Sequence, residues 1–512
     1  MKYLYIMLMA AFLTSCENLL NMTPENSVTF ENAIENEQDM ESAAVTAASF
    51  TRVAIGLENY IYPIFQGEYA DETYGFFREC RNLANSQITG VSWSSVYTII
   101  AQANIMLRYV DKIPLSESKR KYYRGTACFY KALSYLNIVR RWGDCVLIED
   151  DILMEPVAKS SWVNVVNYAI ELAEQAVELL PEFDEYADMR GNPAIYRSTV
   201  CKGAANALLA NLCAWKAGCK YMAQPADRNY DEGELWAKAE KACSAIIARS
   251  SVYSLVGNAE EICTSVLVGE SSESIFEITL KDSWHEITSY QKQAPFCMGT
   301  VYQAYPSVPG RPEGYVTQLA FMIRPSSVRE MYPGSDERKD AFFYKLDEME
   351  ALGDGITGGR AYPNKWRKTV VATEGWLAGQ FVNFNQNQIV WRLADIYLLR
   401  AECRVRQGKD TEAISDLNTV RRRSKAADYH ASERNGDLRL AIFKEREREL
   451  LFEGQRYYDV IRNGYHTTEL ESGFQHASEQ DMIDGCFFLP VHEYAFERNP
   501  LMRQNTYWSR KQ

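Results

Sequence analysis

Apolar residues recur at helical spacing along most of the chain, whereas the alternation typical of half-buried strands is scarce. In residues 392–406 the apolar positions form one stripe, made of Leu393, Ile396, Tyr397, Ala401 and Val405. Gly408 ends this predicted helix, and only Lys409 and Asp410 separate it from a second one. The apolar face of the second helix comprises Ala413, Ile414, Leu417 and Val420. The segment therefore predicts an antiparallel helix pair.

The same pattern occurs upstream. Leu208, Leu209, Cys213, Trp215 and Gly218 follow the order of Leu398, Leu399, Cys403, Val405 and Gly408. A partner helix is predicted at residues 234–247, a further pair at 122–142 and 162–179, and another helix at 93–111. Because one helix pair cannot bury its own apolar face, such pairs must stack on neighbours. We therefore predict an all-α fold built as a tetratricopeptide-like helical repeat.

The helical period is lost between Ser271 and Asn387, where glycine, proline and aromatic residues become frequent. Loops of this length in a compact protein are usually functional or disordered, and the aromatic content argues against disorder. We therefore expect an ordered, loop-rich and aromatic-rich insertion at residues 271–387. It separates an N-terminal helical region at 16–270 from a C-terminal one at 388–512.

Residues 353–358 of this insertion read Gly-Asp-Gly-Ile-Thr-Gly, the letters of a dinucleotide-binding fingerprint. That fingerprint needs a strand before it and a helix after it, but Gly359 to Pro363 follow instead. We interpret the match as a flexible loop. The Gly-x-Ser-x-Gly motif of many hydrolases is absent from the sequence.

The N-terminal residues resemble a bacterial lipoprotein signal. Lys2 precedes an apolar run at residues 3–13, and Leu13-Thr14-Ser15-Cys16 resembles a lipobox. The resemblance implies that residues 1–15 are a signal peptide and that acyl chains on Cys16 anchor the protein to a membrane. No later segment has the roughly 18 consecutive apolar residues of a spanning helix. An ordinary signal peptide with an incidental cysteine is the alternative.

Composition narrows the range of partners. The chain has 512 residues, of which 46% are hydrophobic, and its net charge of −13 argues against nucleic acid as a partner. It has 12 cysteines, so lipidation of Cys16 would leave an odd number. The histidines and cysteines form no metal-binding motif, and we expect no metal site and no cofactor. Four cysteines lie in apolar helical patterns and suit buried positions: Cys128, Cys213, Cys243 and Cys403.

The stretch ERERELLFEGQRYYDVIRNG, residues 445–464, closely resembles the signature of the SusD/RagB family of outer-membrane nutrient-binding lipoproteins. Further resemblances follow in the family's order: Trp93-x-x-x-Tyr97 with Asn104, and residues 124–144, 392–402 and 487–505. The resemblance implies a lid-like, non-enzymatic protein that captures an oligomeric nutrient, commonly a glycan. It also implies attachment to the outer membrane, facing outward, and delivery of the nutrient to a SusC-like TonB-dependent transporter.

Charged residues alternate in sign within this signature, at Glu445, Arg446, Glu447, Arg448 and Glu449. Such neighbours predict a polar network that fixes the last helices to the rest of the protein. Arginine beside a carboxylate lowers its pKa, which is the wrong direction for a general acid. The pattern therefore favours a structural role over catalysis.

Aromatic side chains suit sugar binding, because their faces pack against ring C–H groups while nearby polar groups bind hydroxyls. Residues 68–82 offer Asp71, Tyr74, Phe76, Arg78 and Arg81. The insertion offers Trp284, Tyr290, Tyr302 and Tyr305, and then Tyr362, Trp366 and Trp376. We predict that both regions together form the ligand site. Tryptophans at apolar helical positions are predicted to be core: Trp93, Trp142, Trp215, Trp236 and Trp391.

The sequence does not identify the ligand. A starch-like glycan, a fructan, a host glycan and a peptide all fit, since relatives of the RagB type are associated with peptides. A tetratricopeptide scaffold would instead bind other envelope proteins in a concave helical groove. A lipid-anchored glycoside hydrolase would need a carboxylate of raised pKa in a cleft.

Overall fold

The computed structural model describes residues 33–57, 70–73, 92–149, 155–280, 321–352, 359–371, 378–379, 381–470, 476–497 and 499–510. These residues are mostly helical, which confirms the predicted all-α, tetratricopeptide-like class. No helix within these ranges is long and apolar enough to cross a membrane. The Gly353–Gly358 motif lies outside the described residues.

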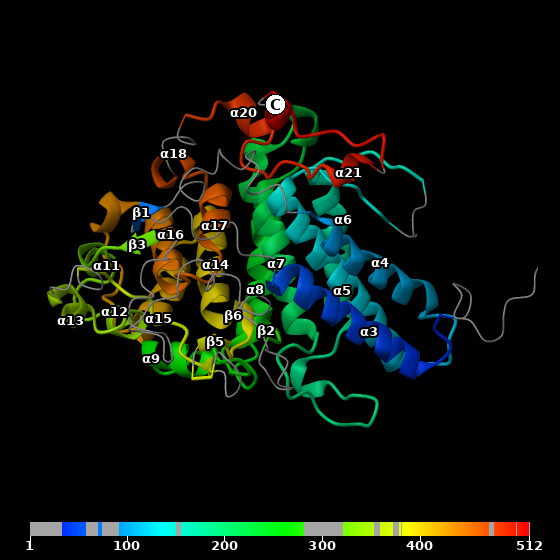
Figure 1. Cartoon of the computed structure of the whole chain (residues 1–512), viewed down its shortest axis with the longest axis horizontal. Coiled ribbons are helices and arrows are strands. Elements are labelled where there is room, and N and C mark those ends of the chain that lie inside the picture. The colour runs from blue at the N-terminus through cyan, green and yellow to red at the C-terminus, as the bar shows by residue number, and fades with distance from the viewer. Residues whose placement is uncertain are drawn as a thin grey trace, which may run out of the picture.

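Long helices succeed one another along the chain and pack against their neighbours. They are α3 (Glu37–Thr51), α4 (Ser94–Tyr109), α5 (Glu117–Trp142), α6 (Trp162–Leu179), α7 (Lys202–Gly218), α8 (Glu232–Ile247), α14 (Leu393–Arg406), α15 (Asp410–Arg423), α16 (Leu438–Glu449) and α17 (Arg456–Asn463). Contacts run from α4 through α5, α6, α7 and α8 to α14 and α15. In Figure 1, α3–α6 accordingly lie on one side, α7 and α8 in the middle, and α14–α17 on the other side.

The predicted helix pairs are confirmed as α5 with α6, α7 with α8, and α14 with α15. Gly408 joins the last pair with a φ of +74°, a left-handed conformation that glycine adopts without a steric penalty. Polar side chains fix several helix starts. The Ser116 hydroxyl accepts a hydrogen bond from the Lys119 amide, and Ser161 caps α6 through the Asn164 amide in the same way.

Shorter helices fill the connections. They are α9 (Ala259–Glu261), α11 (Pro325–Met331), α12 (Arg338–Phe342), α13 (Leu346–Ala351), α18 (His466–Glu469), α20 (Glu479–Ile483), α21 (Tyr494–Glu497) and α22 (Thr506–Ser509). Three of them, α11 to α13, lie within the predicted insertion, so its described part is less loop-rich than the sequence suggests. Two π-helical turns occur at Arg52–Leu57 and Ile262–Val266.

The strands form three small antiparallel sheets. Their members are β1 (Ala70–Thr73) with β3 (Phe321–Ile323), β2 (Ser274–Ile278) with β6 (Gln388–Arg392), and β4 (Thr369–Val371) with β5 (Phe381–Phe384). In the second sheet Ser274 lies opposite Arg392, and Ile278 opposite Gln388. This sheet therefore pairs the residues on either side of the predicted insertion and closes its base.

The core contains all five tryptophans predicted for it: Trp93, Trp142, Trp215, Trp236 and Trp391. The four cysteines assigned to helical interiors are also buried and free of disulfides, as are the other cysteines that the structure describes. Burial raises the pKa of the Cys213 thiol to about 12, which keeps it protonated. These cysteines act as small apolar side chains.

Candidate ligand-binding site

Helix α16 carries charged side chains into the protein interior, where Glu445 and Glu449 are fully buried. The Glu449 carboxylate accepts hydrogen bonds from Arg392 at 2.6 Å and from Arg338 at 3.1 Å, and it also pairs with Arg423. Glu445 lies 2.7 Å from the same Arg338 guanidinium. Three arginines from separate segments therefore converge on one helix.

Arg392, the last residue of β6, extends this network to the base of the insertion. Its guanidinium donates hydrogen bonds to Glu273 at 2.8 Å and to Glu453 at 2.8 Å. Lys365, a fully buried residue of the insertion, donates a hydrogen bond to Glu453 at 2.6 Å. The network therefore holds the insertion, β6 and α16 in one arrangement.

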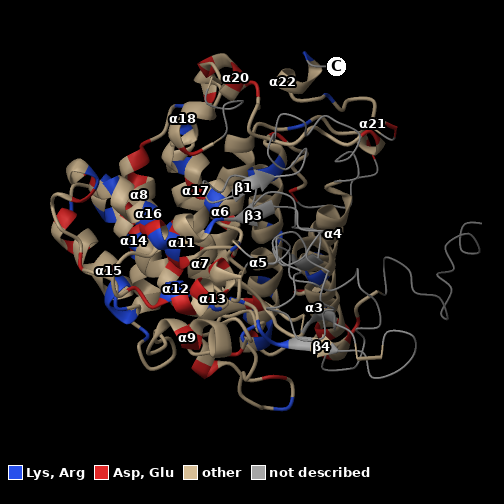
Figure 2. Ribbon diagram, turned by 60° about the vertical axis from the view of Figure 1, so that its left-hand side comes forward, with Lys and Arg blue, Asp and Glu red and all other residues tan. Residues whose placement is uncertain are grey.

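A second group of ion pairs ties α16 to α14 and α17. Arg446 lies 2.7 Å from the Asp395 carboxylate and 2.9 Å from that of Asp459. On α17, Arg462 pairs with Glu402 of α14 at 2.6 Å. These contacts confirm the polar network predicted from the signature. Figure 2 shows the acidic and basic positions that supply it interspersed over α12 and α14–α17.

Charges within the network set the protonation of its carboxylates. Burial by itself raises the pKa of Glu445, but the charges of Arg338, Arg421 and Arg448 outweigh it and lower the pKa to about 2. Arginines in the same way hold the pKa of Glu449 well below its usual range against the effect of burial. Both groups are ionised at neutral pH and are unsuited to donating a proton.

The β1–β3 sheet joins the two regions predicted to bind ligand. Thr73, at the end of β1, lies opposite Phe321, at the start of β3. The residues after Thr73 begin with Tyr74, and the residues before Phe321 end the segment that contains Trp284 and Tyr305. The sheet therefore joins residues 70–73 of the first region to residues 321–323 of the insertion, although more than 200 residues separate them in sequence.

Of the predicted ligand residues, Asp71 lies within β1, at an irregularity where the register passes from Ala70 to Glu72. Such bulges often occur beside functional sites. Eight others lie outside the described residues: Tyr74, Phe76, Arg78, Arg81, Trp284, Tyr290, Tyr302 and Tyr305. Cys16 and Trp376 also lie outside them.

Trp366 has a different environment from the one expected for a ligand-stacking residue. Its side chain is only 7% exposed, and its ring lies 6.4 Å from that of Phe452. Tyr362, from the same predicted group, is 1% exposed. Because neither ring leaves a face open to a sugar, we place both in the hydrophobic core and leave them out of the proposed site.

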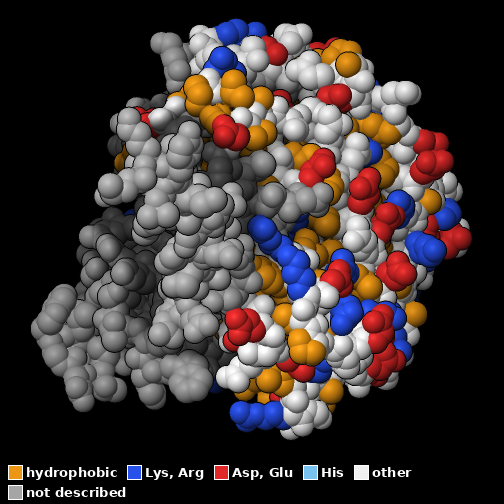
Figure 3. All heavy atoms as spheres, turned by 90° about the vertical axis from the view of Figure 1, so that its right-hand side faces the viewer, with side chains coloured by type: hydrophobic (Ala, Val, Ile, Leu, Met, Phe, Trp, Pro, Cys, Tyr) orange, Lys and Arg blue, Asp and Glu red, His pale blue; other side chains and the backbone are white. Residues whose placement is uncertain are grey.

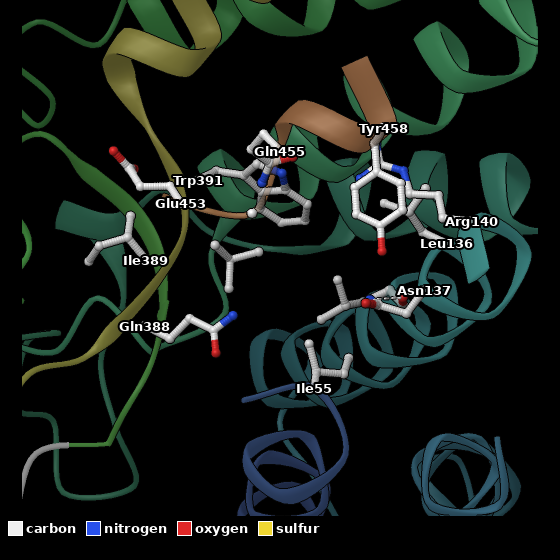
Figure 4. Close-up of a pocket in the computed structure, with 13 residues that line it drawn as sticks. Ile55, Leu136, Asn137, Arg140, Gln388, Ile389, Trp391, Glu453, Gln455 and Tyr458 are labelled. Atoms are coloured by element: carbon white, nitrogen blue, oxygen red, sulfur yellow. Dashed lines mark hydrogen bonds between the residues drawn. The ribbon is translucent and has the colours of Figure 1, made fainter. Parts of the chain in front are cut away.

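A pocket of about 60 Å³ lies between α5, β6 and the turn that leads into α17 (Figure 4). Arg140 and Tyr458 stand together at one end of it, and Gln388 stands at the other. The Arg140 Nε–H and the Gln388 Oε1 are buried and have no hydrogen-bond partner among the residues that the structure describes. Buried polar atoms without partners are rare in native proteins and call for a ligand or ordered water.

Sequence reasoning did not single out this pocket, although one signal was available. Arg140 interrupts the apolar run of α5, where a charged residue at an inward position needs a reason. Its wall also includes Ile55, from the π-helical turn Arg52–Leu57, and Gln388, which lies opposite Ile278 of β2.

Two family models match the chain. One, described as the SusD family, matches residues 355–508, and the other, described as starch-binding and associating with the outer membrane, matches residues 15–212. The chain belongs to the SusD/RagB family. The family signature predicted at residues 445–464 lies within the first match.

Known SusD-like proteins match most of this chain. SusD-like protein P25 of Formosa agariphila is 24% identical over 509 residues, covering 88% of this chain and 87% of its own. A SusD homolog from Bacteroides thetaiotaomicron has a TM-score of 0.71 at 22% identity, over 93% of this chain and 99% of that one. The surface glycan-binding protein A of B. thetaiotaomicron, solved with laminarihexaose, has a TM-score of 0.67 at 18% identity, over 92% and 100%. At these identities the solved structures establish the fold.

A second pocket, of about 280 Å³, lies in this SusD-like chain between the start of α6 and the C-terminal segment. Polar groups that line it already form hydrogen bonds within the protein. The Asp144 carboxylate accepts a hydrogen bond from the Trp162 amide at 2.9 Å, and the Lys159 ammonium donates one to Asn505 at 2.7 Å. We therefore regard the pocket near Arg140 as the better candidate for a ligand.

The face on the side of α3 and α4 carries acidic and basic side chains interspersed with apolar ones (Figure 3). Single-sign fields steer charged partners over long distances, whereas a mixed face of this kind provides little steering.

Replacing Glu445 with Gln tests the network. Its folded-state pKa of about 2 lies below the ordinary value of 4.5, so the ion pairs stabilise the protein above pH 4.5 and are lost as the pH falls toward 2. Removing one partner of a buried pair costs about 3–5 kcal/mol. We expect a loss of this size at pH 7 in urea unfolding, and a smaller loss near pH 3.

Glu348→Gln is the matched control. Glu348 is 65% exposed and pairs with Lys345 at the surface, so its loss should change stability by less than about 1 kcal/mol. Equal effects of the two substitutions at pH 7 would contradict a structural role for the buried network.

Proposed function

We propose that this protein is a cell-surface lipoprotein that binds an oligomeric nutrient, in particular a glycan, and delivers it to a SusC-like TonB-dependent transporter. The pairing of β1 with β3 supports the proposal, because it joins Ala70–Thr73 of the first predicted region to Phe321–Ile323 of the insertion. The relative solved with laminarihexaose supports a glycan as the ligand class. The second family description, starch-binding and associating with the outer membrane, supports the location.

The residue types in the two regions suit a saccharide. Tyr74 and Trp284 offer flat apolar faces to the C–H groups of a sugar ring, and Asp71, Arg78 and Arg81 offer partners for hydroxyls. An extended glycan presents several rings in a row, so aromatic residues from two regions can bind successive units. We propose that residues on both sides of the β1–β3 sheet contact one ligand.

We also propose that the protein binds its ligand without cleaving it. A glycosidase needs a carboxyl group with a raised pKa beside a second carboxylate in an open cleft. Burial raises the pKa of Glu277, but its side chain is fully buried and its Oε2 accepts a hydrogen bond from Asn387 at 2.9 Å. Burial also raises the pKa of the Asp144 carboxyl, but this group accepts a hydrogen bond from the Trp162 amide.

Two alternatives make different predictions. A peptide-binding member of the family would bind peptides and no oligosaccharide at the same site. A tetratricopeptide scaffold would bind a protein in the helical groove near α14 and α15, and the aromatic residues of the insertion would be dispensable.

Removing a stacking aromatic residue tests the site. We expect Trp284→Ala or Tyr74→Ala to weaken glycan binding by about 1–3 kcal/mol, or roughly tenfold to a hundredfold in Kd, because each substitution removes a ring face. Isothermal titration calorimetry against a panel of oligosaccharides that includes laminarihexaose measures the effect. The melting temperature should stay unchanged if these residues lie outside the core.

Tyr196→Ala serves as the control, because this tyrosine is 57% exposed and lies in the connection between α6 and α7, outside both predicted ligand regions. It should bind like the wild type. If both site variants keep wild-type affinity, the ligand binds elsewhere. Binding of peptides with no binding of any oligosaccharide would transfer the function to peptide uptake.

The lipid anchor is tested by Cys16→Ala in cells. Because acylation of Cys16 would supply the membrane attachment, the variant should leave the membrane fraction, whereas Cys213→Ala, which alters a buried cysteine, should remain in it. Immunoblots of salt-washed membranes report the result. A Cys16→Ala protein that still sediments with the outer membrane would contradict the anchor.

A further inference from the structure

Arg140 is a buried cation that no carboxylate neutralises by direct contact within the described part of the chain. Its side chain is 8% exposed, and its Nη2 donates a hydrogen bond to the neutral Asn211 amide oxygen at 3.0 Å. Its Nε–H has no partner. By contrast, the arginines of the α16 network pair with carboxylates, as the contacts of Arg338, Arg392, Arg446 and Arg462 show.

Two aromatic rings hold the Arg140 guanidinium in place. The ring centroids of Trp215 and Tyr458 lie 5.4 Å and 5.2 Å from its central carbon. Burial, together with the nearby charge of Arg462, lowers the pKa of Arg140 to about 10, so the group still carries its charge at neutral pH. The pocket therefore contains a fixed positive charge with an unused donor.

The carboxylate that lines the same pocket does not cancel this charge. Glu453 accepts hydrogen bonds from Arg392 and from Lys365, so two cations already hold it. The opposite end of the pocket is neutral, because Gln388 contributes an amide whose oxygen has no partner. An anion in the pocket would meet one unpaired cation and polar amide groups.

The size of the pocket limits what can enter it. One water needs roughly 10–15 Å³ of such volume, so about 60 Å³ admits a group of a few atoms but no whole sugar ring. A carboxylate has this size and forms strong, charge-assisted hydrogen bonds with a guanidinium. The remainder of such a ligand would stay outside the pocket.

We propose that this pocket receives the carboxylate of an acidic sugar residue, with Arg140 as the anion-binding group, so that the protein selects acidic glycans over neutral ones. The inference rests on the proposed glycan-binding function. In the complex, the Arg140 Nε–H donates to a carboxylate oxygen, and Gln388 binds the same group or an adjacent hydroxyl.

Matched ligand pairs test the selectivity by calorimetry. The probes are 3′-sialyllactose with lactose, and trigalacturonic acid with its methyl ester, measured beside the neutral oligosaccharide panel. We expect the acidic member of at least one pair to bind about tenfold to a hundredfold more tightly than its neutral counterpart. Excess acetate should weaken binding of the acidic member and leave neutral ligands unaffected.

Two substitutions separate the role of the charge from an effect on folding. Arg140→Met removes the cation, and Gln388→Glu leaves Arg140 in place but adds a negative charge at the far end of the pocket. Both should abolish the preference for the acidic member, and wild-type affinity for a neutral oligosaccharide shows that a variant is folded. Loss of the preference in Gln388→Glu supports the proposal even if Arg140→Met fails to fold.

The outcomes distinguish this inference from the proposed function. If neutral oligosaccharides bind and no acidic probe binds more tightly than its counterpart, the pocket contains only water and the inference is wrong, while glycan binding stands. An acidic preference that both variants retain would also overturn it. If no oligosaccharide of either kind binds, the proposed function itself fails.

Discussion

The burial of the α16 charges is the constraint on which the rest of the structure depends. A charge removed from water is tolerated only when partners surround it, and an ion left without its partner is strongly destabilising. Glu445 and Glu449 find their partners on β6, α12 and α15, segments that are distant in sequence. If one of these segments were displaced, a buried charge would lose its partner, so the network favours a single arrangement of the fold.

This constraint also positions the candidate site. Lys365 and Arg392 attach the insertion to the helical body through Glu453, and the β2–β6 sheet closes its base. Glu453 also lines the Arg140 pocket, so one residue joins the structural network to the candidate ligand pocket. A stable base of this kind lets variable loops change their ligand without disturbing the fold, which is how many binding proteins diversify.

Local sequence patterns predicted the helices well because apolar residues on the buried face of a helix recur about every 3.6 residues. The pairs around Gly218 and Gly408 and the charged signature of α16 were recognisable for this reason. The β1–β3 pairing was not predictable, because it joins residues more than 200 positions apart and each strand is too short to show a period. Trp366 illustrates a different limit: a loop aromatic can face a ligand or anchor its loop, and only the contact with Phe452 distinguishes the two.

The central claim is that residues 68–82 and the insertion bind one ligand together. Hydrogen–deuterium exchange, followed by mass spectrometry with and without a saturating oligosaccharide chosen from the calorimetry panel, tests it most directly. The account predicts slower exchange in both regions when the ligand is bound, and unchanged exchange in α15. Protection confined to the groove near α14 and α15, with both regions unaffected, would contradict it.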